Sequence, residues 1–347
     1  MKRIESLDDN QLRILTKAFG NYFQLINIAE DQQRIRVLRD RELKDDKSES
    51  IDDALATLKA QGIDAAAVRD MLNKVEVRLV LTAHPSESKR QEVLIKLREI
   101  ALMTRDYDRT TLLPREEHSL LDAMAERIEE LWHTRPTRST KATVSDEVQF
   151  GLYFLTDVIM DEVVDIHIEL RQALDKHYPD ADWSNLPQVV KFASWVGGDR
   201  DGNPNVTADV TLDTLETLRQ AGRAAYLADV EQLRISLTQA TDEIGASQAI
   251  IDAVEPLGGY ERLRGSAASK FPGEVYRQQM ELVHYRLTNN IYGRSEELLN
   301  DLRPVIDSLK NHRGHRAARG RVFRLMQKVR LFGLHIVPPE VREDAGR

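Results

Sequence analysis

Three short runs of mainly apolar residues interrupt a chain whose other apolar positions recur at helical spacing. The runs cover residues 77–81, 189–196 and 331–337 and are rich in Val, Leu and Phe. Short, nearly continuous apolar runs are typical of strands that are buried on both faces of a parallel sheet. We therefore predict three parallel strands, each of which is followed by a polar segment.

Most of the remaining chain is predicted to be helical, because its apolar residues recur every three or four positions. A polar loop is expected over residues 105–114. Helices are expected over residues 12–43, 51–73 (divided near Gly62), from 88 onward, 116–134, 144–177, 207–240, from 247 onward and within 310–330. We expect residues 1–74 to form a helical lead-in and residues 75–347 to form a single large domain.

A histidine follows the first predicted strand. His84 lies after Leu81 and before a helix that Ser88 and Gln91 are expected to cap. Catalytic groups of parallel α/β proteins gather at the carboxyl ends of strands, which makes His84 a candidate catalytic residue. The alternative is a histidine that caps a neighbouring helix or fills a polar gap.

A glycine pair and a dense polar loop follow the second predicted strand. Gly197 and Gly198 permit a sharp turn, and the loop DRDGNP comes directly after them. A plain surface turn also favours these residue types. A calcium-binding EF-hand loop is excluded, because Pro204 and Val210 stand where that loop needs Gly and Glu.

An arginine follows the third predicted strand. Arg342 comes after Pro338 and Pro339. The planar guanidinium suits phosphate, whereas the alternative is an arginine that lies in solvent near the end of the sequence.

Composition and charge narrow the classes of function. The 347 residues are 41% hydrophobic and 31% charged, include no cysteine and carry a net charge of −8. These values are typical of a globular protein and exclude disulfides and thiolate metal sites. The net charge disfavours general nucleic-acid binding, and the basic residues of 310–330 are interpreted as one face of an amphipathic helix. We find no membrane span or signal peptide and expect a cytoplasmic protein.

Acidic residues surround a second histidine, His167. Such a group can bind a metal ion, but at helical spacing it more often forms a solvated face, and we predict no metal site there. The acidic residues are Asp161, Glu162, Asp165 and Glu169.

Two motifs carry a resemblance to a known family. TAHPSE followed by Arg90, and FASWVGGDRDGNPNVT, resemble the two amino-terminal signatures of phosphoenolpyruvate carboxylase. Weaker similarity extends over nearly the whole chain, including LFGLHIVPPEVR, although Glu340, Glu343 and Ala345 depart from the usual residues there. Ser86 replaces the usual threonine of the first motif.

The resemblance implies the addition of bicarbonate to phosphoenolpyruvate, which gives oxaloacetate and phosphate and replenishes the tricarboxylic acid cycle. His84 matches the catalytic histidine and Arg342 a phosphate-binding arginine, while Arg200 is expected to help bind the substrate. The residues expected to support the loops are Asp199, Asp201, Asn203 and Arg90.

The resemblance also implies a mainly α fold with a few parallel strands, in the form of a partial (β/α)8-type barrel with large helical insertions. Three strands cannot close such a barrel, so we expect a fragment that needs a missing carboxyl-terminal half or a second copy. The ligands of a Mg²⁺ cofactor are expected outside this chain. We therefore predict that the chain alone is inactive; the alternative is a non-catalytic helical binding protein that retains the motifs.

Overall fold

The computed structural model divides into two compact units. The first combines Met1–Ala54 with His84–Ala142, and the second combines Leu55–Ala83 with Thr143–Arg347. The structure describes residues 7–44, 48–82, 90–109, 111–136, 142–201, 203–254, 267 and 269–343. The predicted separation of a lead-in over residues 1–74 from a domain over 75–347 stays a prediction.

Helix α1 (Asp9–Leu43) of the first unit begins with a capping box. The Asp8 carboxylate accepts a hydrogen bond from the backbone N–H of Gln11, whose side chain accepts one from the backbone N–H of Asp8. This reciprocal pairing satisfies donors that the first helical turn leaves free. The structure thus confirms the helix that the sequence predicts over residues 12–43.

Two further helices, α4 (Gln91–Arg109) and α5 (Pro114–His133), pack with α1. Their buried apolar residues are Val93, Ile100 and Leu131. The predicted loop over residues 105–114 is wrong in its first half, because α4 continues to Arg109. An ion pair between Arg36 and Asp108 (2.5 Å) and a hydrogen bond from Tyr107 to Glu117 (2.9 Å) satisfy the polar side chains of that last helical turn.

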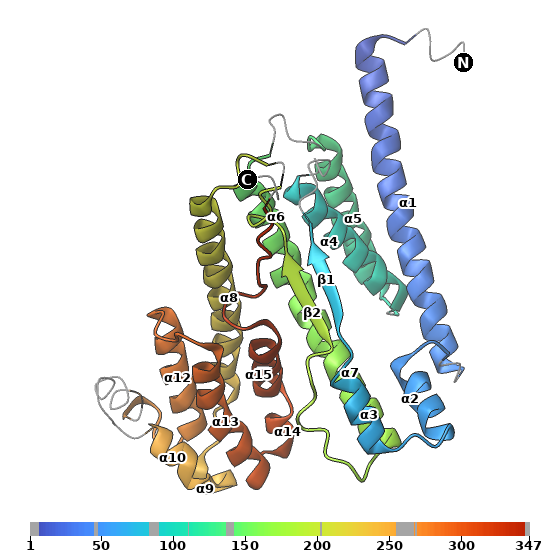
Figure 1. Cartoon of the computed structure of the whole chain (residues 1–347). Helices are drawn as coiled ribbons and strands as arrows, with labels where there is room; N and C mark the ends of the chain where they lie inside the picture. Colours follow the sequence, from blue (N-terminus) through green and yellow to red (C-terminus); the bar gives the residue numbers. More distant parts are fainter. Residues whose placement is uncertain are drawn as a thin grey trace. The chain divides into compact units, whose positions relative to one another are not determined.

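A two-stranded parallel sheet lies in the second unit. Strand β1 (Val77–Leu81) pairs with β2 (Val190–Ser194), with Leu79 opposite Phe192, and the two arrows run side by side in Figure 1. The structure confirms both predicted strands. It contradicts complete burial of β1, because Val77 is 51% exposed and Leu79 is 50% exposed. Within the described residues β1 has one neighbouring strand, so it forms an edge.

The third predicted strand, over residues 331–337, is wrong. Leu331 and Phe332 end helix α15 (Arg321–Phe332), because they continue the buried face that Val322 and Val329 begin. Gly333, with a φ of 62°, then turns the chain out of the helix. Parallel pairing starts later, at an isolated bridge between Pro339 and Ser194 and a second between Arg342 and Asp199. The partial (β/α)8 barrel therefore stays a prediction, while the mainly α character is evident.

Most of the core of the second unit lies among its helices. The long helix α8 (Ala208–Ser236) packs against α6 (Val144–Phe154), α12 (Val275–Thr288) and α15. Thr207 caps α8, since its hydroxyl accepts a hydrogen bond of 3.3 Å from the backbone N–H of Val210. The other elements are α2 (Ile51–Ala60), α3 (Ala65–Leu72), the π-helical turn η1 (Leu155–Ile159), α7 (Met160–His177), α9 (Thr241–Ile244), α10 (Gln248–Val254), α13 (Ser295–Asn311) and α14 (His315–Ala318).

The helix predicted over residues 144–177 is confirmed as the continuous series α6, η1 and α7. Asp161 and Asp165, which the sequence assigned to a solvated face, pair with Arg324 of α15. Lys328, one turn further along α15, is 8% exposed and bonds Asp229 at 2.9 Å. The basic face predicted for this helix is therefore partly buried against carboxylates. None of the helices that the structure describes has the length and apolar character of a membrane span.

Candidate functional site

Two glycines shape the turn after β2. Gly197 has a φ of 75°, which favours glycine, and its carbonyl accepts a hydrogen bond from the Thr211 hydroxyl at 2.8 Å. A Cβ atom at Gly198 would lie 2.7 Å from the carbonyl oxygen of Glu340. The absence of a side chain at Gly198 therefore allows the segment around Glu340 to lie directly against the turn.

Backbone hydrogen bonds join the loop after β2 to that segment. The N–H of Glu340 donates to the carbonyl of Ser194 at 2.8 Å, and the N–H of Arg342 donates to the carbonyl of Gly198 at 3.1 Å. The N–H of Arg200 then donates to the carbonyl of Arg342 at 2.8 Å. These bonds fix the two arginines next to each other although they are far apart in the sequence.

The Arg342 guanidinium lies over the indole ring of Trp195, 4.2 Å from the ring centroid. It also lies 3.5 Å from the Asp199 carboxylate and 4.0 Å from that of Asp201. Stacking on an aromatic face and pairing with carboxylates restrict the rotation of a long side chain. The arrangement therefore holds a cation in a defined position at the carboxyl end of β2.

The second arginine has a carboxylate partner, and one of its other donors is buried without a partner. Arg200 Nη1 donates to Glu343 Oε1 at 2.6 Å. Its Nε is buried and has no hydrogen-bond partner among the described residues. A buried guanidinium N–H without a partner is costly.

Three residues that the sequence did not assign to the site connect it to both strands. Trp195 Nε1 donates to Glu340 Oε2 at 2.8 Å, and Arg78 of β1 lies 3.5 Å from Glu340 Oε1. Only one signal for them exists in the sequence, the position of Trp195 two residues before the glycine pair. Nothing local in the sequence predicts that Glu340 and Arg78 reach it.

The remaining predicted site residues lie elsewhere or outside the described residues. The Asn203 side chain accepts a hydrogen bond from the N–H of Asn205 at 3.1 Å and so stabilises its own turn. Arg90 belongs to the first unit, where it pairs with Glu92 at 3.0 Å. His84 and Ser88 lie outside the described residues.

The described residues do not fit a magnesium ion. In the described ranges, no group of three or more His, Asp or Glu side chains could hold a metal. Asp199 and Asp201, the carboxylates of the loop, face the Arg342 guanidinium instead.

The complete sequence, residues 1–347, matches the family model described as phosphoenolpyruvate carboxylase. The chain belongs to the phosphoenolpyruvate carboxylase family. It is 32% identical to the phosphoenolpyruvate carboxylase of Roseiflexus castenholzii, in an alignment over 97% of this chain and 38% of that protein. The corresponding enzyme of Xanthomonas campestris pv. campestris is 31% identical over 99% of this chain and 39% of that protein.

The family relationship confirms the resemblance drawn from the two motifs. A third relative, the phosphoenolpyruvate carboxylase of Thermus thermophilus, is 30% identical over 100% of this chain and 38% of its own length. The chain thus spans less than two fifths of the curated relatives that it matches.

Proposed function

We propose that this chain provides the amino-terminal part of a phosphoenolpyruvate carboxylase and binds the phosphate of phosphoenolpyruvate at Arg342 and Arg200. The observation that carries the proposal is the backbone pairing that joins the loop of Arg200 to the segment of Arg342 after β2. Membership of the family supports the reaction class. The whole reaction converts phosphoenolpyruvate and bicarbonate to oxaloacetate and phosphate.

The proposed chemistry requires cations that stabilise the negative charge of the phosphoryl group while it is transferred. The phosphoryl group passes from the enolate oxygen to bicarbonate, so fixed guanidiniums stabilise the charge on its oxygens throughout the transfer. Arg342 suits this role because Trp195 and Asp199 already restrict it, which reduces the reorganisation required during the reaction.

His84 is proposed to act as the base. Carboxyphosphate must lose a proton before it breaks into carbon dioxide and phosphate beside the enolate. An imidazole with a pKa near neutrality can accept that proton. The support for this role is the match of His84 to the first family motif.

The proposal places the magnesium ligands in the part of the family that this chain does not span. When bound, the ion would add positive charge near the phosphate and the enolate oxygen. A missing carboxyl-terminal half is the first candidate source of those ligands, and a second copy of the chain is the other.

The test combines this chain with the downstream part of the Roseiflexus castenholzii relative. In a coupled oxaloacetate assay with magnesium and bicarbonate, we expect no turnover from the chain alone and clear turnover from the combination. His84→Asn should abolish the restored turnover, and Arg342→Gln should raise the KM for phosphoenolpyruvate strongly. Arg303→Gln, which removes an arginine from an exposed ion pair with Glu296 on α13, is the matched control.

Two results would count against the proposal. Turnover by the chain alone would contradict the dependence on a second part. A folded combination that binds neither phosphoenolpyruvate nor bicarbonate would favour the non-catalytic helical binding protein instead.

A further inference from the structure

The carboxylate of Glu340 joins the segment after α15 to the tryptophan that follows β2. Its Oε2 accepts the hydrogen bond from Trp195 Nε1 at 2.8 Å, and its Oε1 lies 3.5 Å from the guanidinium of Arg78 on β1. The two oxygens of this carboxylate therefore contact two different partners. The function proposed above gives Glu340 no role.

Backbone hydrogen bonds hold both Glu340 and Trp195 against the sheet. The N–H of Glu340 donates to the carbonyl of Ser194 at 2.8 Å, and the N–H of Trp195 donates to the carbonyl of Leu81 at the same distance. The carbonyl oxygen of Glu340 lies 2.7 Å from the position that a Cβ atom at Gly198 would take. The contact between the carboxylate and the indole therefore starts from two fixed points of the backbone.

Two residues of the same segment reach the ring of Trp195. Bridges at Pro339 and Arg342 pair this segment with the end of β2 and the loop after it, and side chains two positions apart in a paired segment share a face. Val341, between Glu340 and Arg342, is accordingly 55% exposed. The edge of the indole donates to Glu340, while the centroid of the ring lies 4.2 Å from the guanidinium carbon of Arg342. The orientation of the indole therefore links the two side chains.

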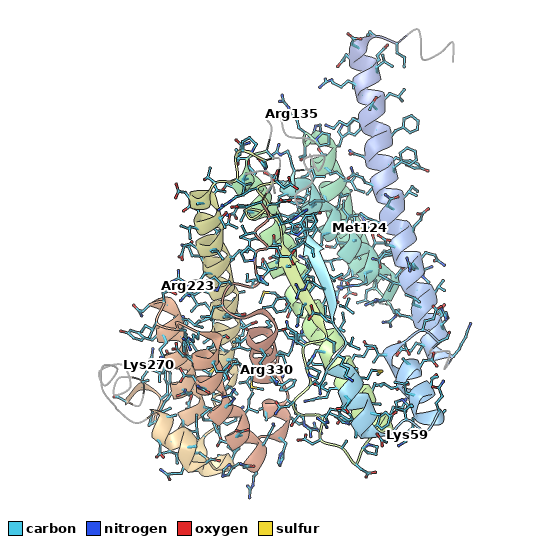
Figure 2. All side chains as sticks on the ribbon, in the orientation of Figure 1. Lys59, Met124, Arg135, Arg223, Lys270 and Arg330 are labelled. Carbon is cyan, nitrogen blue, oxygen red and sulfur yellow. The ribbon has the colours of Figure 1, made fainter. Side chains whose placement is uncertain are left out.

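A second stack of an arginine on a tryptophan in the same unit provides a comparison. The Arg69 guanidinium carbon lies 4.6 Å from the centroid of Trp183, whose indole N–H donates to the backbone carbonyl of Tyr178 at 3.0 Å. Lys59, labelled in Figure 2, lies over the Tyr178 ring, 4.7 Å from its centroid. The acceptor at Trp195 is a charged side chain instead of a carbonyl. A hydrogen bond to a charged acceptor is about twice as strong as a neutral one, and a substitution can remove it.

We propose that Glu340 is a positioning residue for Arg342 and acts through the indole of Trp195. The proposal rests on the phosphate-binding role of Arg342 proposed above. The carboxylate holds the ring in the orientation that presents its face to the guanidinium, and its negative charge raises the electron density of the indole. That electron density attracts a cation above the ring, so both effects keep Arg342 in place for the phosphate.

The first test is NMR of the chain alone, which requires no carboxylase activity. Trp195→Phe identifies the indole N–H signal of Trp195, and Arg342→Gln identifies the Nε–H signal of Arg342. Glu340→Met keeps the length of the side chain and removes the acceptor. It should move the Trp195 signal upfield, because the hydrogen bond is lost, and the Arg342 signal downfield, because the guanidinium leaves the shielded region above the ring. Unchanged signals would overturn the proposal.

A conservative variant and two references make this test specific. Glu340→Gln, whose amide oxygen still accepts a hydrogen bond, should keep most of both shifts. The signals of Trp183 and Arg69 should stay in place in every Glu340 variant. Glu296→Met, which removes a carboxylate from an exposed ion pair on α13, should leave the Trp195 and Arg342 signals unchanged. Shifts of equal size in Glu296→Met would overturn the specific role of Glu340.

The second test measures the binding of phosphate. In Glu340→Met, the dissociation constant of the chain for inorganic phosphate should rise about fivefold, as the net loss of one hydrogen bond predicts. In the background of Trp195→Phe, which has no indole N–H, the same substitution should cause no further rise. An equal rise in that background would overturn the action through Trp195. A parent chain that binds no phosphate would contradict the function proposed above, whereas the NMR signals would still decide whether Glu340 positions Arg342.

Discussion

His167 should make the second unit less stable as the pH falls below neutrality. Burial, and then the nearby Arg330 and Arg171 guanidiniums, lower the pKa of His167 from 6.5 to about 4. Between these two values the unfolded chain binds a proton that the folded chain does not. The contribution of His167 to stability is therefore fully present above pH 6.5 and is lost as the pH falls to about 4.

The size of this effect follows from the shift in pKa. Proton linkage between a value of 6.5 in the unfolded chain and about 4 in the folded chain gives a loss of about 2 kcal/mol between about pH 7 and about pH 5. The complete loss, below both values, is roughly 3 kcal/mol, because one pKa unit corresponds to about 1.4 kcal/mol.

Urea unfolding at the two pH values measures this difference. Both the parent chain and His167→Gln should carry Trp132→Phe, so that the fluorescence of Trp183 and Trp195 reports on the second unit alone. The free energy of unfolding of the parent should fall by about 2 kcal/mol more than that of the glutamine variant, which has no ring to protonate. Equal losses in the two proteins would refute the assignment of the pH dependence to His167.

Three substitutions test other parts of the second unit. Gly198→Ala should weaken phosphate binding at the loop after β2, because the added Cβ would lie 2.7 Å from the Glu340 carbonyl; inorganic phosphate titrated against the parent and the variant measures this, and unchanged affinity would show that the turn can relax. Thr207→Ala should lower the free energy of unfolding by about 1 kcal/mol, because it removes the cap of α8. Thermal unfolding measures that loss, and Thr207→Ser, which keeps the hydroxyl, should restore most of it. Met280→Ala, at a fully buried position of α12, should cost about 2–5 kcal/mol in urea unfolding; a cost below about 1 kcal/mol would mean that the core collapses around the cavity.

The three apolar runs show that such a run predicts a strand in some sequence contexts and not in others. The runs at 77–81 and 189–196 lie between polar segments, and both form strands. The run at 331–337 directly follows a helical pattern, so its first residues extend the buried face of α15. A short apolar run beside an amphipathic helix is compatible with either structure. The turn at Gly333, which decides between them, depends on a φ that composition does not reveal.

The direction of the side chains on α7 explains why the acidic residues near His167 in the sequence do not surround its ring. His167 follows Asp165 by two positions, and residues two apart on a helix do not face each other. Asp165 accordingly pairs with Arg324 and is largely exposed, whereas His167 is buried near Gln327. Proximity in the sequence therefore suggested that carboxylates lie next to the His167 ring, but the helix directs Asp165 away from it.

The described side chains at the loop after β2 carry more negative than positive charge. Three guanidiniums there face four carboxylates. The guanidiniums are Arg78, Arg200 and Arg342, and the carboxylates are Asp199, Asp201, Glu340 and Glu343. A phosphate that approaches must displace or compensate these carboxylates, because like charges at short distance repel. The proposed function therefore requires further positive charge, and the magnesium ion and additional cationic side chains of the remaining three fifths of the family's length are its proposed source.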